Sequence, residues 1–325
     1  MDKLSAIKAP IDSELNCFIE RFESSLTHKD EMLGDVLQHI RQRGGKRMRP
    51  ILTLLLAKNF SNINDVTIDA AIGLELLHTA SLVHDDVVDE SEERRGQPSV
   101  NASYNNKVAV LVGDYILSTA LLYVSQTRNN RIIESLAQLG RTLSRGEILQ
   151  LNNIMNTDIS EDVYYDVIRM KTASLFSTCA AIGCISVGCT EEEVKAAHEF
   201  GDQIGMIFQI RDDIFDYYDS KDIGKPTGND MMEGKLTLPA IFALSKTRNE
   251  QMLALARRVK NRAVSAEEIA SLVNFSKQEG GIDYAHSVMD KLNKSADKYI
   301  ESHIRNADIA DALHEYLAFV SQRNW

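Results

Sequence analysis

The sequence has 325 residues, of which 44% are hydrophobic and 26% are charged, and its formal net charge is −11. This composition is that of a globular chain with a large core, and it excludes intrinsic disorder. The negative charge argues against a broad nucleic-acid surface or a polybasic membrane anchor. Only five residues are proline, well below the typical ~5%, so long uninterrupted helices are expected.

The four cysteines predict a reduced, cytoplasmic protein. No two are spaced as CxxC, and Cys179, Cys184 and Cys189 follow one another at five-residue steps in an apolar stretch. That spacing suits helix packing better than a metal cage. The first residues hold no apolar run long enough for a signal peptide. The uncharged stretch 172–190 approaches membrane-spanning length but is rich in Ser, Thr, Gly and Cys, so we expect a buried helix and no transmembrane segment.

The hydrophobic periodicity is helical almost throughout, and no convincing run alternates with a period of two. Capping boxes predict helix starts at Thr190 and Ser265. No low-complexity linker divides the chain, so we predict one all-α domain over residues 1–325. In chain order, the helical pattern is expected to break at Gly44-Gly45, at Arg95 to Pro98, at Asn129-Asn130, at 224–234 and at Gly280-Gly281.

The motif DDxxD occurs twice, each time after an apolar helical segment. The first and last aspartates of each motif lie four residues apart and share a helix face. Such crowded carboxylates are costly at the end of an apolar helix unless cations offset them, and all-oxygen ligands suit Mg²⁺. We therefore expect two central helices whose acidic ends face each other around Mg²⁺ and a diphosphate, although two solvated acidic runs are the alternative. The motif residues are Asp85, Asp86, Asp89, Asp212, Asp213 and Asp216.

Basic side chains close to the acidic motifs also point to a diphosphate. Arg94 and Arg95 follow the first motif, and the segment GGKRMRP at 44–50 adds a second basic cluster. Arginine forks match phosphate oxygens, and lysine acts as a point charge. Lys225 and Lys235 lie in the glycine-rich loop after the second motif. They could close over the site, but lysines of a mobile surface loop would look the same.

The signature blocks of the all-trans isoprenyl diphosphate synthases resemble five segments of this chain, and the long-chain octaprenyl type is the most similar. The resemblance implies an all-α isoprenoid-synthase fold, a helical bundle around a deep central cavity, and a homodimer. The only departure noted is Met48, where Leu is commoner, and that exchange conserves volume. The segments, in order between about residues 44 and 239, are GGKRMRP, LVHDDVVDESEERRGQPSVN, KTASLF, FQIRDDIFDYYD and GKPTGNDMMEGKLTLP.

The resemblance also implies roles for residues at the matching positions. Several Mg²⁺ ions would be held by Asp85, Asp89, Asp212 and Asp216, with Asp86, Asp213 and Lys171 as further catalytic residues. The allylic substrate would contact Arg94, Lys171, Thr172, Gln209, Lys225 and Lys235. Isopentenyl diphosphate would contact Lys46, Arg49, His78 and Arg95. Without the resemblance, His78 and Thr172 are equally compatible with buried, hydrogen-bonded residues.

The implied reaction joins isopentenyl diphosphate to an allylic diphosphate, expected to be farnesyl diphosphate, after ionisation of the allylic C1–O bond. Ala80 and Ser81 precede Asp85 by five and four residues, roughly 6–7.5 Å deeper along a helix. Short-chain members of the family carry bulky aromatic residues here, so small ones predict a long, octaprenyl-like product. Close helix packing would also explain them. Leu121, Leu122 and Tyr123 are candidates for a deeper floor.

Other functions share parts of this pattern. A short-chain farnesyl or geranylgeranyl diphosphate synthase would use the same chemistry. A terpene cyclase would not need the cluster of Lys46, Arg49 and Arg95, and a hydrolase would need a water-activating base that the sequence does not reveal. A non-catalytic partner subunit would be expected to lose aspartates, whereas all six are present. The long product is expected to pass to membrane enzymes.

Overall fold

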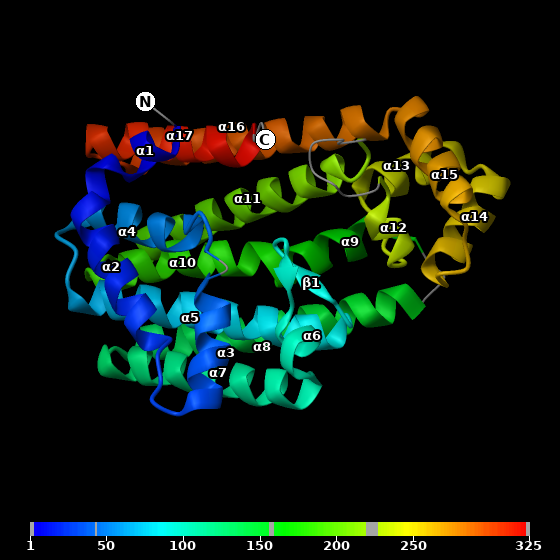
Figure 1. Cartoon of the computed structure of the whole chain (residues 1–325). Helices are drawn as coiled ribbons and strands as arrows, with labels where there is room; N and C mark the ends of the chain where they lie inside the picture. Colours follow the sequence, from blue (N-terminus) through cyan, green and yellow to red (C-terminus); the bar gives the residue numbers. More distant parts are fainter. Residues whose placement is uncertain (1–2, 43, 156–158, 219–226, 323–325) are drawn as a thin grey trace. The chain divides into compact units, whose positions relative to one another are not determined.

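The structure is a computed structural model that describes residues 3–42, 44–155, 159–218 and 227–322. The described residues are almost entirely helical (Figure 1). Among them, the only strands are β1 (Glu93–Arg94) and β2 (Gln97–Pro98), which pair antiparallel as one short hairpin. The predicted all-α fold is confirmed.

The chain divides into two compact units, and each is described by itself. Unit 1 consists of residues 1–140, 175–201 and 300–316, and unit 2 of residues 141–174, 202–299 and 317–325. Because this division does not test whether residues 1–325 form a single domain, that expectation stays a prediction.

Unit 1 holds the N-terminal helices and the hairpin. Its helices are α1 (Lys3–Lys8), the 3₁₀ turn η1 (Ala9–Ile11), α2 (Asp12–Ser25), α3 (Glu31–Gln42), α4 (Met48–Phe60), α5 (Asp65–Val88), α6 (Val100–Tyr104), α7 (Asn106–Gln126) and, from its second residue, α10 (Ser174–Ser186). Unit 2 holds α9 (Glu161–Ile168), the π-helical turn η2 (Arg169–Ala173), α12 (Asn229–Met232), α13 (Leu238–Thr247), α14 (Glu250–Lys260) and α15 (Ala266–Gln278). The helices that run from one unit into the other are α8 (Asn130–Met155), α11 (Glu191–Phe215), α16 (Gly281–His303) and α17 (Ala307–Ser321).

The core of unit 1 forms around α5. This helix packs against α7, α4 and α2, and Figure 1 shows α5 beside α7. A glycine makes the close approach possible, because a Cβ atom at Gly73 would lie only 2.5 Å from Cγ1 of Val124 on α7. In α10, every residue from Leu175 to Ser186 is buried. The prediction of a buried helix in the stretch 172–190 is therefore confirmed for this part.

Within the part of the chain that the structure describes, two helices are long and apolar enough to cross a membrane by length and composition alone, a test that core helices of water-soluble proteins also pass. They are α5 and α7, whose most apolar windows are 78% and 33% buried in the fold, respectively. The expected absence of a transmembrane segment stays a prediction.

The predicted break at Arg95 to Pro98 is the turn of the hairpin. Arg95 and Gly96 have φ angles of 55° and 76°, as the two central residues of a type I′ turn require. A residue other than glycine rarely adopts this backbone conformation. This backbone conformation directs the Arg95 side chain towards the loop that precedes α4. There, Nη1 of Arg95 donates to the carbonyl of Gly44 at 3.0 Å.

Both predicted capping boxes are present. The Thr190 N–H donates to Oε2 of Glu193 at 2.9 Å, and the Glu193 N–H donates back to Oγ1 of Thr190 at 3.3 Å. At the start of α15, Ser265 and Glu268 exchange the same two hydrogen bonds, at 2.9 and 3.4 Å. These contacts satisfy backbone donors that the first turn of a helix leaves unpaired. In unit 2, α15 also packs against α13 and α14 (Figure 1).

Candidate active site

The first acidic motif lies at the end of α5 in unit 1. The middle one of its three aspartates, Asp86, is turned away from solvent. Asp86 is fully buried, and its Oδ1 accepts a hydrogen bond from Nε of Arg94. Asp85 is half-buried, whereas Asp89 is exposed just beyond the helix. Since consecutive residues of a helix point about 100° apart, the outer aspartates are left on the accessible side.

Basic side chains gather beside this motif around a cavity of about 50 Å³, which we call the arginine pocket; Arg47, Arg94, Arg95, Glu75, His78 and Asp86 line it. Nη1 of Arg47 donates to Oε1 of Glu75 at 3.3 Å, and the guanidinium of Arg47 lies 4.5 Å from the ring centroid of Phe22. Arg49 reaches the same group of residues, because its Nη1 lies 2.8 Å from Nε2 of His78. Three of the four residues predicted to bind isopentenyl diphosphate, Arg49, His78 and Arg95, are thus close together.

His78 is a neutral acceptor in this pocket. Burial lowers its pKa well below the usual value, and the positive charges of Arg49, Arg95 and Arg94 lower it further. A neutral imidazole has one nitrogen without a proton, and this nitrogen can accept the Nη1–H of Arg49. His78 therefore orients Arg49 without adding positive charge. Lys46, the fourth predicted residue, is exposed and does not line the pocket.

The second acidic motif, at the end of α11 in unit 2, repeats the arrangement of the first. Asp213, its middle residue, is 4% exposed, whereas Asp212 is exposed and its carboxylate accepts no hydrogen bond from the described residues. Asp216 receives the backbone N–H of Asn229 on Oδ1 at 2.9 Å and that of Asp230 on Oδ2 at 3.1 Å. Asp216 therefore fixes the start of α12.

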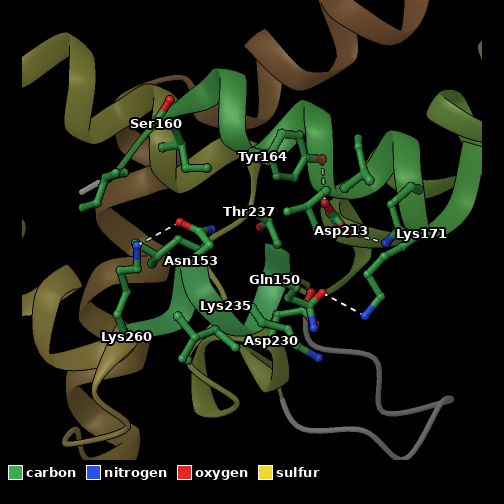
Figure 2. A pocket seen from close by; sticks show the side chains of 18 of the residues that line it. Gln150, Asn153, Ser160, Tyr164, Lys171, Asp213, Asp230, Lys235, Thr237 and Lys260 are labelled. Carbon is green, nitrogen blue, oxygen red and sulfur yellow. Dashed lines mark hydrogen bonds between the residues drawn. The ribbon is translucent and has the colours of Figure 1, made fainter. Parts of the chain in front are cut away.

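A chain of hydrogen bonds holds the middle aspartate of the second motif, and Figure 2 shows the hydroxyl of Tyr164 directed at Asp213. Tyr164 donates to Oδ2 of Asp213 at 2.6 Å, and Nε2 of Gln209 donates to Oδ1 at 2.8 Å. The hydroxyl of Thr172 in turn donates to Oε1 of Gln209 at 2.7 Å. Burial and nearby Asp230 raise the pKa of Asp213 well above its usual value, whereas the two donors lower it.

Lys171 and Thr172 owe their positions to η2. A π-helical turn adds one residue to a helical turn, and such turns are frequent at functional sites. Gly146 on α8 makes room for it, since a Cβ atom there would lie 2.8 Å from Cβ of Met170 and 3.2 Å from the backbone nitrogen of Lys171. Nζ of Lys171 forms an ion pair with Glu147 and donates to Oε1 of Gln150 at 3.0 Å (Figure 2).

These side chains line a second cavity, of about 210 Å³, within unit 2, which we call the lysine pocket. Its lining includes five residues predicted from the sequence, Lys171, Thr172, Gln209, Asp213 and Lys235. Figure 2 labels Lys171, Asp213 and Lys235 among them. Nζ of Lys235 donates to Oε2 of Glu233 at 2.6 Å. Lys225, also predicted to contact the allylic substrate, lies outside the described residues.

Sequence reasoning missed several residues of these pockets. Asp230 lines the lysine pocket, and its pKa is raised to about 7 by burial and by Asp216. Tyr164 lies seven residues before Lys171 on a separate helix, and nothing in its local pattern shows that it reaches Asp213. Arg47 was visible within GGKRMRP, but only its ion pair with Glu75 shows that it faces the pocket.

The residues proposed to control product length lie on α5 and α7. Ala80 is buried, and Ser81 is half-buried with its hydroxyl donating to the carbonyl of His78 at 2.9 Å. Leu121 and Leu122 are 49% and 62% exposed. Their exposure lends no support to a place in a deeper floor, and that role, like the one expected of Tyr123, stays a prediction.

In each unit, taken by itself, carboxylates are available that suit magnesium bound together with a substrate phosphate. Among the described residues, no three Asp, Glu, His or Cys side chains are grouped closely enough to hold a metal ion by themselves. Mg²⁺ does not require such a group, because it commonly keeps several waters and binds one or two carboxylates together with substrate phosphates. Accessible carboxylates of this chemical type are those of Asp85 and Asp89 in unit 1 and, separately, that of Asp212 in unit 2.

Comparison with known proteins identifies the family. The family model described as "Polyprenyl synthetase" matches residues 30–275. The chain belongs to the polyprenyl synthetase family. Polyprenyl synthetases are prenyltransferases of isoprenoid biosynthesis, so the predicted enzyme class is confirmed.

Individual family members differ in the product that they are named for. The octaprenyl diphosphate synthase of Haemophilus influenzae is 34% identical over 303 residues, which cover 93% of this chain and 90% of that protein. A crystal structure of geranylgeranyl pyrophosphate synthase from Bacteroides thetaiotaomicron is 46% identical, with a TM-score of 0.88 and coverage of 99% of this chain and 100% of the other. Polyprenyl synthase from Caulobacter crescentus CB15, crystallised with calcium and isoprenyl diphosphate, is 27% identical with a TM-score of 0.90, and the match covers 98% of each chain.

Proposed function

We propose that this prenyltransferase condenses isopentenyl diphosphate with an allylic diphosphate, farnesyl diphosphate by preference, and forms a long all-trans polyprenyl diphosphate of octaprenyl-like length. The observation that carries the proposal is the repeated geometry of the two acidic motifs. In each, the protein itself engages the middle aspartate, and accessible carboxylates remain beside a pocket of cationic side chains. This combination suits diphosphate substrates.

In the proposed reaction, the two pockets bind different substrates. The lysine pocket, with Lys171, Thr172, Gln209 and Lys235, takes the allylic diphosphate, and the arginine pocket, with Arg49, His78 and Arg95, takes isopentenyl diphosphate. Lys46, Arg94 and Lys225 add positive charge to these sites. Preorganised cations and dipoles of this kind stabilise charge that develops as the allylic C1–O bond breaks.

The proposed cofactor is Mg²⁺, which neutralises charge on the leaving diphosphate when it is bound. Asp85, Asp89, Asp212 and Asp216 would hold it. The calcium present with isoprenyl diphosphate in the Caulobacter crescentus structure supports a divalent cation. Asp86 and Asp213 would act by holding neighbouring side chains in place, as their hydrogen bonds to Arg94, Tyr164 and Gln209 indicate.

A short-chain product is the second candidate. The identity of 46% to a geranylgeranyl pyrophosphate synthase favours it, whereas the small residues Ala80 and Ser81 and the similarity to an octaprenyl diphosphate synthase favour the longer product. One incubation with labelled isopentenyl diphosphate, farnesyl diphosphate and Mg²⁺, followed by sizing of the products, separates the two. Geranylgeranyl diphosphate as the final product would overturn the long-chain proposal.

A non-catalytic partner subunit is the third candidate, and the same incubation addresses it. We propose that the chain is active by itself as a cytoplasmic homodimer, and that its long product passes to membrane enzymes. The variant Asp85→Ala is expected to lose at least about a hundredfold in turnover with unchanged far-UV circular dichroism. Near wild-type turnover of this variant with Mg²⁺ would contradict the assigned chemistry.

A further inference from the structure

Tyr164 is the one aromatic hydroxyl among the described residues that donates to an aspartate of an acidic motif. The side chain is 5% exposed and lines the lysine pocket. Burial and the neighbouring charge of Asp213 raise the pKa of the hydroxyl well above its usual value. The phenol therefore keeps its proton and remains a donor.

The two hydrogen bonds that Asp213 accepts also determine how the side chains of Gln209 and Thr172 are oriented. Tyr164 occupies Oδ2, so the side chain of Gln209 meets Oδ1 with its NH₂ group. An amide whose NH₂ group is fixed has its oxygen fixed on the other side. That oxygen accepts the hydroxyl hydrogen of Thr172. The hydrogen bonds thus converge on Asp213: Tyr164 donates to it from one side, and Gln209, which itself accepts from Thr172, donates to it from the other.

We propose that Tyr164 is a positioning residue for prenyl transfer: its hydroxyl holds Asp213, and through it Gln209 and Thr172, in the orientation that binds the allylic diphosphate. The proposal rests on the proposed function, because it takes the lysine pocket as the allylic site. It assigns to Tyr164 no contact with the reacting atoms.

The test compares two variants that delete the same atom from neighbouring tyrosines. Tyr164→Phe removes the donor to Asp213, whereas Tyr165→Phe is the matched control, because the hydroxyl of Tyr165 interacts with Glu161 and Tyr284 instead. Steady-state kinetics would vary farnesyl diphosphate and isopentenyl diphosphate separately. The double variant Tyr164→Phe/Asp213→Asn completes a cycle that measures coupling between the two residues.

We expect Tyr164→Phe to lose about ten- to a hundredfold in kcat/KM for farnesyl diphosphate, since it leaves a buried oxygen of Asp213 without its hydrogen-bond donor. The KM for isopentenyl diphosphate should stay within about twofold, and Tyr165→Phe should resemble the wild type. In the Asp213→Asn background, Tyr164→Phe should add less than about twofold. A merely structural role would reduce the amount of folded enzyme but would change neither KM nor the coupling.

Two results would overturn the proposal: unchanged kinetics for farnesyl diphosphate in Tyr164→Phe, or losses that multiply independently in the double variant. Calorimetric binding of farnesyl diphosphate with Mg²⁺ separates this failure from failure of the proposed function. Weaker binding by Tyr164→Phe than by Tyr165→Phe supports the positioning role even if the wild type forms no product. Equal binding by the two variants contradicts it.

Discussion

Adjacent aspartates of the two acidic motifs are equipped for different tasks. Asp86 and Asp213 point into their units and are hydrogen-bonded by Arg94 and by Tyr164 with Gln209. Asp212, one residue away on the helix, is exposed. The angular step of about 100° between helical neighbours produces this difference without any change of backbone. Substitutions of neighbouring aspartates should therefore have different effects on turnover and on stability.

Asp212→Ala and Asp216→Ala are expected to differ in stability. Both should reduce turnover with Mg²⁺ as cofactor, but only Asp216 accepts backbone N–H groups at the start of α12. Loss of such a cap costs about 1 kcal/mol. Urea unfolding should show a lower free energy of unfolding for Asp216→Ala than for Asp212→Ala. Equal values would show that the two backbone contacts contribute nothing to the native state.

His78 should make the stability of the protein depend on pH. Its pKa is lowered in the fold by burial, and further by Arg49 from α4 and by Arg95 and Arg94 from the hairpin. Glu75, on the same helix as His78, is the acidic residue that lines the pocket beside it. Below about pH 6.5 the unfolded chain binds a proton that the folded chain does not. The free energy of unfolding therefore falls with decreasing pH, by up to about 1.4 kcal/mol per pH unit for this group.

Urea unfolding between pH 5 and 7.5 would measure this dependence. His78→Gln, which keeps a hydrogen-bond acceptor for Arg49 but cannot titrate, should show a flatter slope than the wild type over this range. The same slope in both proteins would mean that other groups account for the dependence.

At the scale of elements, the sequence predicted helices, caps and breaks better than it predicted contacts between them. The capping boxes at Thr190 and Ser265 are local patterns, and both are present. The π-helical turn η2 was not predicted, because it depends on room that Gly146 provides on a distant helix. For the same reason the aspartates and most cationic residues of the pockets could be named from motifs, whereas Tyr164 and Asp230 could not.

Helix α5 carries both the first acidic motif and the residues proposed to set product length. Ala80→Phe should shorten the product, because an added ring would obstruct a growing chain near the motif. Ala80 is only 1% exposed, so overpacking is expected to cost about 1–3 kcal/mol of stability. Ser81→Phe, at a half-buried position, provides a second variant. Chromatography that shows an unchanged product spectrum for both folded variants would remove the role assigned to this segment.

At the scale of the whole molecule, α7 offers a surface for association with a second copy. Val110, Leu111, Leu121 and Leu122 lie on this helix with 41%, 68%, 49% and 62% of their surfaces exposed. Apolar side chains grouped on one surface often mark an interaction site. The most apolar window of α7 is only 33% buried. The proposed homodimer would cover these side chains.

Leu111→Glu/Leu122→Glu is therefore expected to produce a monomer, because two charges would be buried in the interface. Sedimentation velocity or light scattering measures the mass directly. Met32→Glu, which replaces an apolar side chain of α3 that is 56% exposed, is the control and should leave the mass unchanged. A wild-type protein that is monomeric at micromolar concentration would contradict the proposed dimer, and a dimeric double variant would place its interface elsewhere.

The crowding of guanidinium groups in the arginine pocket gives a way to assay the protein without radioactivity. Burial lowers the pKa of Arg95 below its usual value, and the positive charges of the neighbouring arginines lower it further, whereas Glu75 raises it. An anion that binds only the native state raises the melting temperature by mass action. Differential scanning fluorimetry with a graded set of inorganic and prenyl diphosphates would then rank the molecules that the protein accepts, before any product is made.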